Sequence, residues 1–68
     1  MKNYYVNMNK QSNGEHEVHA EACYKMPLRI NRIPLGQFAS CKIAVSTAKK
    51  FYSKVNGCKT CCIECHTR

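Results

Sequence analysis

Cysteine and histidine side chains gather in two parts of this chain. Cys58 and Cys61 form a Cys-x-x-Cys motif, a spacing that lets two thiolates reach one tetrahedral ion from a tight turn. His19 and Cys23 form a second pair upstream, with three residues between them. Three thiolates and one imidazole are a common ligand set of closed structural zinc sites. The sequence therefore predicts a zinc ion bound by these four residues.

The choice among neighbouring ligands stays open from the sequence. Three further side chains after the motif are alternative ligands, namely Cys62, Cys65 and His66. Cys61 and Cys62 are adjacent and can rarely both bind one small ion. His16 competes with His19, but we interpret His16 as an ordinary strand residue. Cys41 lies in the first turn of a predicted helix, where the dipole lowers a thiol pKa, yet its apolar neighbours favour a buried core cysteine.

Chain length explains why a cross-link is expected. The 68 residues make one small cysteine-rich domain (1–68), whose core alone is barely large enough to stabilise it. Six cysteines could provide disulfides or a metal site. The chain starts at Met1 without an apolar stretch of signal-peptide length, so a cytoplasmic location is expected, where grouped cysteines more often bind metal. A disulfide-linked exported protein without metal is the alternative.

The charge distribution indicates which kinds of partner the protein could bind. The net charge is +7, and residues 22–63 contain basic side chains but no acidic one. Such a field favours nucleic acid or an acidic protein surface, although solubility alone is an equally good explanation. The expected anion-binding face is on the predicted helix and comprises Lys42, Lys49, Lys50 and Lys54. No apolar run is long enough to span a membrane, so no membrane partner is expected. No small-molecule substrate is evident, and the oligomeric state is open.

The elements that must position the site are short. Residues 3–8 and 15–19 alternate between apolar and polar types around a polar turn with Asn13-Gly14, which predicts a β-hairpin. Residues 33–38 predict a short third strand, with Pro34 on an edge. Ser40 as N-cap and apolar residues at helical spacing predict one amphipathic helix over about 41–55, ended by a left-handed Gly57. The expected fold class is α+β, closed by a cysteine-rich C-terminal knuckle.

Two resemblances follow from these motifs. His19-x-x-x-Cys23, Leu35-Gly36-x-Phe38-x-Ser40 and Gly57-Cys58-x-x-Cys61 resemble the metal-binding domain of the bacterial adaptive-response DNA methyl-transfer protein. Nearly the whole chain, including His-Glu-Val-His and the Gly-Cys-x-x-Cys-x-x-x-Cys-His tail, is similar to short stand-alone bacterial proteins without assigned function. In the DNA-repair domain a zinc-bound cysteine accepts a methyl group. The matching residue here is His19, so the resemblance implies the scaffold and not the methyl transfer.

The sequence thus favours a zinc-stabilised binding module over an enzyme. No partnered nucleophile, phosphate loop or pair of carboxylates is visible. A thiol redox protein is a further alternative, because Cys58 and Cys61 have the spacing of a redox pair. Redox pairs normally open a helix, however, whereas this pair follows the predicted end of one.

Overall fold

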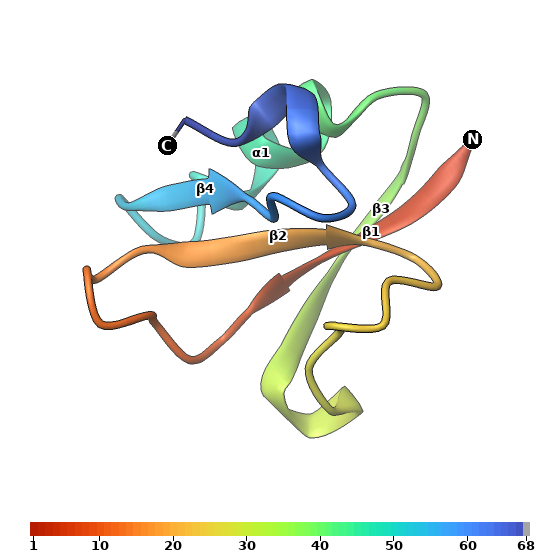
Figure 1. The fold of residues 1–68 in the computed structure, drawn as a ribbon. Helices are drawn as coiled ribbons and strands as arrows, with labels where there is room; N and C mark the ends of the chain where they lie inside the picture. The colour runs from red at the N-terminus through yellow and green to blue at the C-terminus, as the bar shows by residue number, and fades with distance from the viewer. Residues whose placement is uncertain (68) are drawn as a thin grey trace.

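The structure, a computed structural model, describes residues 1–67 and shows one helix packed on a four-stranded mixed sheet (Figure 1). The strands are β1 (Lys2–Asn7), β2 (His16–Ala20), β3 (Arg32–Phe38) and β4 (Val55–Gly57), and the helix is α1 (Cys41–Ala48). The 3-10 turn η1 (Arg29–Asn31) precedes β3, and a second 3-10 turn, η2 (Ile63–Cys65), follows β4. The predicted α+β class is confirmed.

The predicted hairpin forms the centre of the sheet. β1 and β2 pair antiparallel, with Val6 opposite Val18 and Tyr4 opposite Ala20. These four side chains are buried on the face that α1 covers. Gly14 has a φ of 88°, a left-handed conformation that glycine adopts without steric cost, and it helps to turn the chain between the strands. Alternation of apolar and polar residues therefore predicted the correct strands and the correct buried face.

The predicted third strand is also present. β3 pairs antiparallel with the other side of β1 and forms one edge of the sheet, in the order β3-β1-β2-β4. Pro34 lies opposite Tyr5, next to a shift in register between Tyr4 and Tyr5. A proline has no backbone N–H to donate, and an edge strand tolerates that loss.

The helix is shorter than predicted. Ser40 caps it as expected, its Oγ accepting a hydrogen bond of 3.0 Å from the Lys42 backbone N–H. It ends at Ala48 and not near residue 55. Seven more helical residues would carry the chain about 10 Å further along the helix axis. The chain instead reverses, so that Phe51 is 53% exposed and residues 55–57 return to the sheet.

The returning segment forms β4, which the sequence did not reveal. β4 pairs parallel with β2, with Val18 opposite Gly57. The predicted left-handed helix stop at Gly57 is wrong, because Gly57 lies in this strand. Its small size has another reason: a Cβ there would lie 2.7 Å from the Cys65 Cβ and 2.9 Å from the Cys62 carbonyl oxygen. Gly57 thus lets the C-terminal segment pack directly on the strand.

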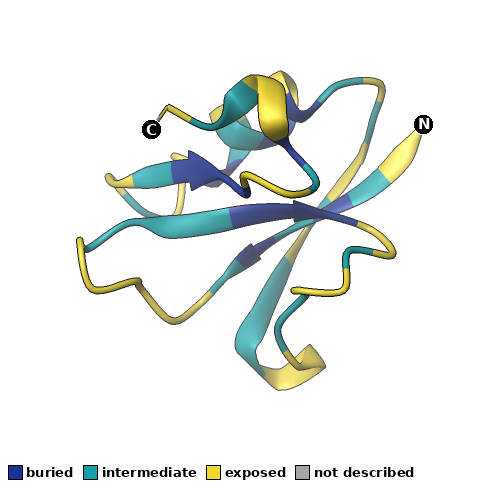
Figure 2. Cartoon of the chain, in the orientation of Figure 1, coloured by how far each residue is buried: buried dark blue, intermediate teal, exposed yellow. Residues whose placement is uncertain are grey.

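The core lies between the sheet and α1 (Figure 2). Its buried members come from β1, β2, α1 and the C-terminal segment, namely Tyr4, Val6, Val18, Ala20, Cys41, Ala44, Ala48 and Cys62. Across residues 1–67, the structure contains no helix of the length and apolar character that a membrane crossing requires. Most core side chains are small, so cross-links between the elements matter for stability.

Candidate metal centre

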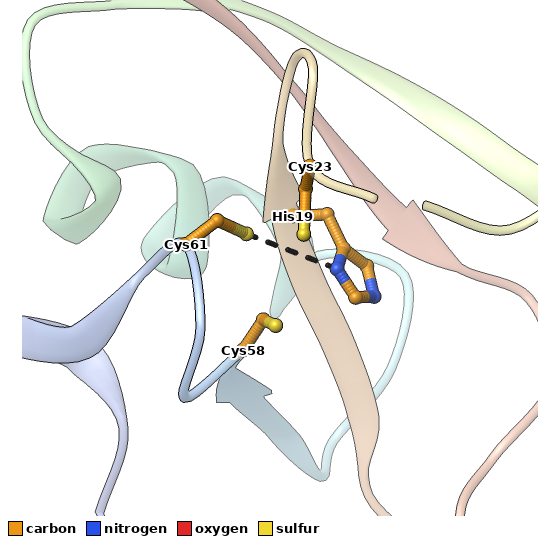
Figure 3. Close-up of side chains that lie close together, drawn as sticks. All are labelled: His19, Cys23, Cys58 and Cys61. Carbon is orange, nitrogen blue, oxygen red and sulfur yellow. Dashed lines mark hydrogen bonds between the residues drawn. The ribbon is translucent and has the colours of Figure 1, made fainter. Parts of the chain in front are cut away.

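The four predicted ligands converge from two segments beside the end of β2 (Figure 3). His19 lies in β2, and Cys23 lies in the turn after that strand. Cys58 follows β4 directly, and Cys61 is three residues further on. The parallel pairing of β2 and β4 brings the second segment to the first, because the Cys58 N–H donates a 2.9 Å hydrogen bond to the Val18 carbonyl.

The spacing of the ligand atoms suits one small ion. The ligand atoms of the four residues all lie within 4.8 Å of one another, and Cys61 Sγ is 3.9 Å from His19 Nδ1. Zinc–sulfur bonds of about 2.3 Å in a tetrahedron separate two sulfurs by about 3.8 Å. A small inward movement of the side chains would therefore complete a tetrahedral site. This arrangement could hold a metal ion.

A tight turn directs Cys23 back toward His19. The Cys23 N–H donates a 3.2 Å hydrogen bond to the Ala20 carbonyl, and Ala22 between them has a φ of 69°. A left-handed alanine is unusual and costs roughly 1 kcal/mol or more, so the surrounding structure must maintain it. The three-residue spacing between His19 and Cys23 thus corresponds to a strand end followed by a reversal, which places both side chains in the same site.

Backbone N–H groups point at two of the sulfurs. Thr60 donates to Cys58 Sγ at 3.4 Å, and Ala20 donates to Cys61 Sγ at 3.3 Å. Burial alone raises the pKa of Cys58, but hydrogen bonds from the backbone N–H groups of Cys61 and Thr60 and from the Cys61 side chain together outweigh burial, and the net pKa is lowered. Burial dominates at Cys61 and raises the pKa of that thiol. The backbone N–H groups thus favour the thiolate form of Cys58, whereas burial favours the neutral thiol of Cys61.

The imidazole of His19 is suited to bind a cation. The side chain is only 1% exposed, and burial lowers its pKa, an effect that Glu17 opposes and Lys25 reinforces. His19 is therefore neutral at neutral pH and has a lone pair available for a metal. Its Nε2 atom lies 3.5 Å from Glu17 Oε1, on the side of the ring away from Cys61.

The alternative cysteine ligands lie outside the four-residue cluster. Cys62 is 1% exposed and packs in the core, with its Sγ 4.0 Å from Cys61 Sγ. Cys65 forms a disulfide with Cys41. Cys41 is buried, as predicted for a core cysteine, but its disulfide partner was not predictable from the spacing of the cysteines. Cys61 is therefore the downstream cysteine that joins Cys58 in the cluster.

The alternative histidines also make other contacts. His66 Nδ1 donates a 3.0 Å hydrogen bond to the Gly57 carbonyl, which ties the C-terminal segment to β4. His16 stacks on Tyr52 with ring centroids 3.6 Å apart, and its Nδ1 donates to the Asn7 carbonyl at 2.9 Å. The interpretation of His16 as a strand residue agrees with its place in β2, whereas the alternative role of His66 as a ligand does not fit this geometry.

The four lysines of the predicted anion-binding face do not all lie on the helix. Because α1 ends at Ala48, only Lys42 lies within the helix. Lys49 is the C-cap, Lys50 lies in the following turn, and Lys54 immediately precedes β4. All four lysines are exposed, but they do not form one helical face.

Comparison of the chain with protein-family models, curated proteins and solved structures finds no match. The site is therefore interpreted from its own geometry. That geometry adds two features that the sequence analysis missed, the Cys41–Cys65 disulfide and the contact of Glu17 with His19. Only the second had a visible signal, since residues two apart in a strand share a face.

Proposed function

We propose that this protein is a small zinc-stabilised binding module in which His19, Cys23, Cys58 and Cys61 bind one structural zinc ion. The observation that supports the proposal most strongly is the convergence of one imidazole and three unpaired cysteines within 4.8 Å. Zinc is the ion most often bound by this ligand set. Hydrogen bonds from backbone N–H groups to Cys58 and Cys61 favour the thiolate form that zinc requires.

Four protein ligands favour a structural ion over a catalytic one. Catalytic zinc keeps a coordination position for water or substrate, whereas a closed tetrahedral set leaves none. Zinc binding to such sites contributes about 10–16 kcal/mol in peptide models, which is comparable with the whole stability of a small domain. The zinc ion would therefore supply much of the free energy that this small core lacks, and no catalytic role is proposed.

The proposed partner is anionic. The net charge of +7 and the four exposed lysines, Lys42, Lys49, Lys50 and Lys54, support attraction to nucleic acid or to an acidic protein. A cytoplasmic location belongs to the same proposal, because reducing conditions keep the three ligand cysteines available for zinc. Those conditions would also reduce Cys41–Cys65, so in the cytoplasm the zinc ion would be the cross-link that remains. Nucleic acid is the simpler partner to test, since its affinity should fall steeply with salt concentration. Weak or salt-independent binding would contradict this part of the proposal.

Native mass spectrometry tests the zinc site. The freshly purified protein should carry one zinc ion per chain and lose it on unfolding. Cys23→Ser and Cys58→Ser should each lose the ion, whereas Cys62→Ala, a matched control beside the site, should retain it. A metal-free protein with disulfides in addition to Cys41–Cys65 would contradict the proposal and favour the disulfide-linked alternative.

A further inference from the structure

We infer that Glu17 is a positioning residue for the metal centre: its carboxylate holds the imidazole of His19 so that Nδ1 faces the ion. The inference rests on the proposed zinc site and adds to it a residue outside the four ligands. Glu17 and His19 are two residues apart in β2, so both side chains project from the same face of the sheet.

The two nitrogens of His19 face different partners. Nδ1 lies 3.9 Å from Cys61 Sγ, on the side of the cysteines, as the close-up shows (Figure 3). Nε2 lies 3.5 Å from Glu17 Oε1. In the part of the chain that the structure describes, the Glu17 carboxylate makes no other ion pair or hydrogen bond. The carboxylate is therefore available to the imidazole alone.

This arrangement determines which nitrogen can bind the ion. A neutral imidazole carries one proton, and the nitrogen that bears it cannot bind a metal. A carboxylate accepts a hydrogen bond but cannot donate one, so Glu17 favours the tautomer with the proton on Nε2. Nδ1 is then left with its lone pair toward the three cysteines. The same contact restricts rotation of the ring, because both ring nitrogens then have fixed partners.

Burial makes the contact important. His19 is 1% exposed and the Glu17 side chain 20% exposed, so water has little access to Nε2. Without Glu17 the Nε2 atom would lose the carboxylate that lies 3.5 Å away, and the ring could turn or take the other tautomer. Carboxylates that orient metal-binding histidines in this way typically change metal affinity 10–100-fold when they are removed.

The experiment compares three variants with the wild type. Glu17→Ala should weaken zinc affinity roughly 10–100-fold, measured by competition with a chromophoric chelator. Glu17→Gln retains an acceptor oxygen and should restore most of the affinity. Glu21→Ala is the matched control, since it also removes one carboxylate near the end of β2. The Glu21 carboxylate is exposed and accepts a hydrogen bond from Asn3. This control should bind zinc as the wild type does.

A spectroscopic measurement on the zinc-loaded wild type needs no variant. Long-range ¹H–¹⁵N NMR should show His19 with a protonated Nε2 and a metal-bound Nδ1. A metal-bound Nε2, or equal zinc affinity of Glu17→Ala and wild type, would overturn the inference while leaving the zinc site intact. A wild-type protein that binds no zinc would overturn the proposed function itself, and the inference with it.

Discussion

Reduction of the Cys41–Cys65 disulfide should lower the free energy of unfolding by about 3.5 kcal/mol. The bond joins the first turn of α1 to η2 across a sequence separation of 24. In the loop-entropy description, a closed loop of that length removes about 12 cal/mol/K of entropy from the unfolded chain, or about 3.5 kcal/mol at 25 °C. Reduction removes the bond and leaves both side chains in place, so packing changes little.

Urea denaturation at a fixed free zinc concentration measures the effect. With a slope of about 1 kcal/mol per molar urea for so small a domain, the midpoint of unfolding should fall by about 3.5 M on reduction. The double variant Cys41→Ala with Cys65→Ala is the control, because its midpoint should not respond to the reductant. A wild-type midpoint that moves by less than about 0.5 M would show that the bond does not constrain the chain as described.

Three further perturbations have expected outcomes. Ser40→Ala removes the cap that accepts from Lys42 N and should cost about 1 kcal/mol in chemical denaturation. Gly57→Ala forces a methyl group against Cys65 and the Cys62 carbonyl and should cost roughly 1–3 kcal/mol in the same assay, whereas unchanged stability would contradict the close packing of the C-terminal segment. Burial lowers the pKa of His19, so its contribution to stability is complete above about pH 6.5 and is lost as pH falls toward the lowered pKa. Zinc retention followed from pH 8 to pH 5 should decrease over the same range, since protons also compete for the thiolates.

The hairpin and the capped helix start were predictable because local patterns determine them. Alternation predicted one apolar face from Tyr4, Val6 and Met8; Tyr4 and Val6 are buried there with Val18, whereas Met8 lies beyond β1 and is 45% exposed. Ser40 predicted the start of α1 because its side chain bonds a backbone N–H only two residues further along the chain. The end of the helix was not predictable in this way, because the apolar spacing continues through Phe51 and Tyr52.

Tertiary pairing determined the features that the sequence missed. Three residues of β4 carry too little pattern to predict a strand, and their position depends on a parallel ladder with β2. A glycine after a helical pattern indicates a helix stop, but Gly57 instead provides the space for close approach by Cys65. Likewise, the spacing of possible ligands predicted His19 and Cys58. Only the fold shows that Cys61 lies in the cluster, whereas Cys65 forms a disulfide with Cys41.

X-ray absorption at the zinc edge tests the central claim most directly, because it counts the atoms bound to the ion by type and distance. Coordination by His19, Cys23, Cys58 and Cys61 predicts three sulfurs at about 2.3 Å and one nitrogen at about 2.0–2.1 Å. In the Cys61→Ser variant, the spectrum should lose one sulfur or the ion altogether. Four sulfurs, or two sulfurs with two nitrogens, would contradict this set of ligands.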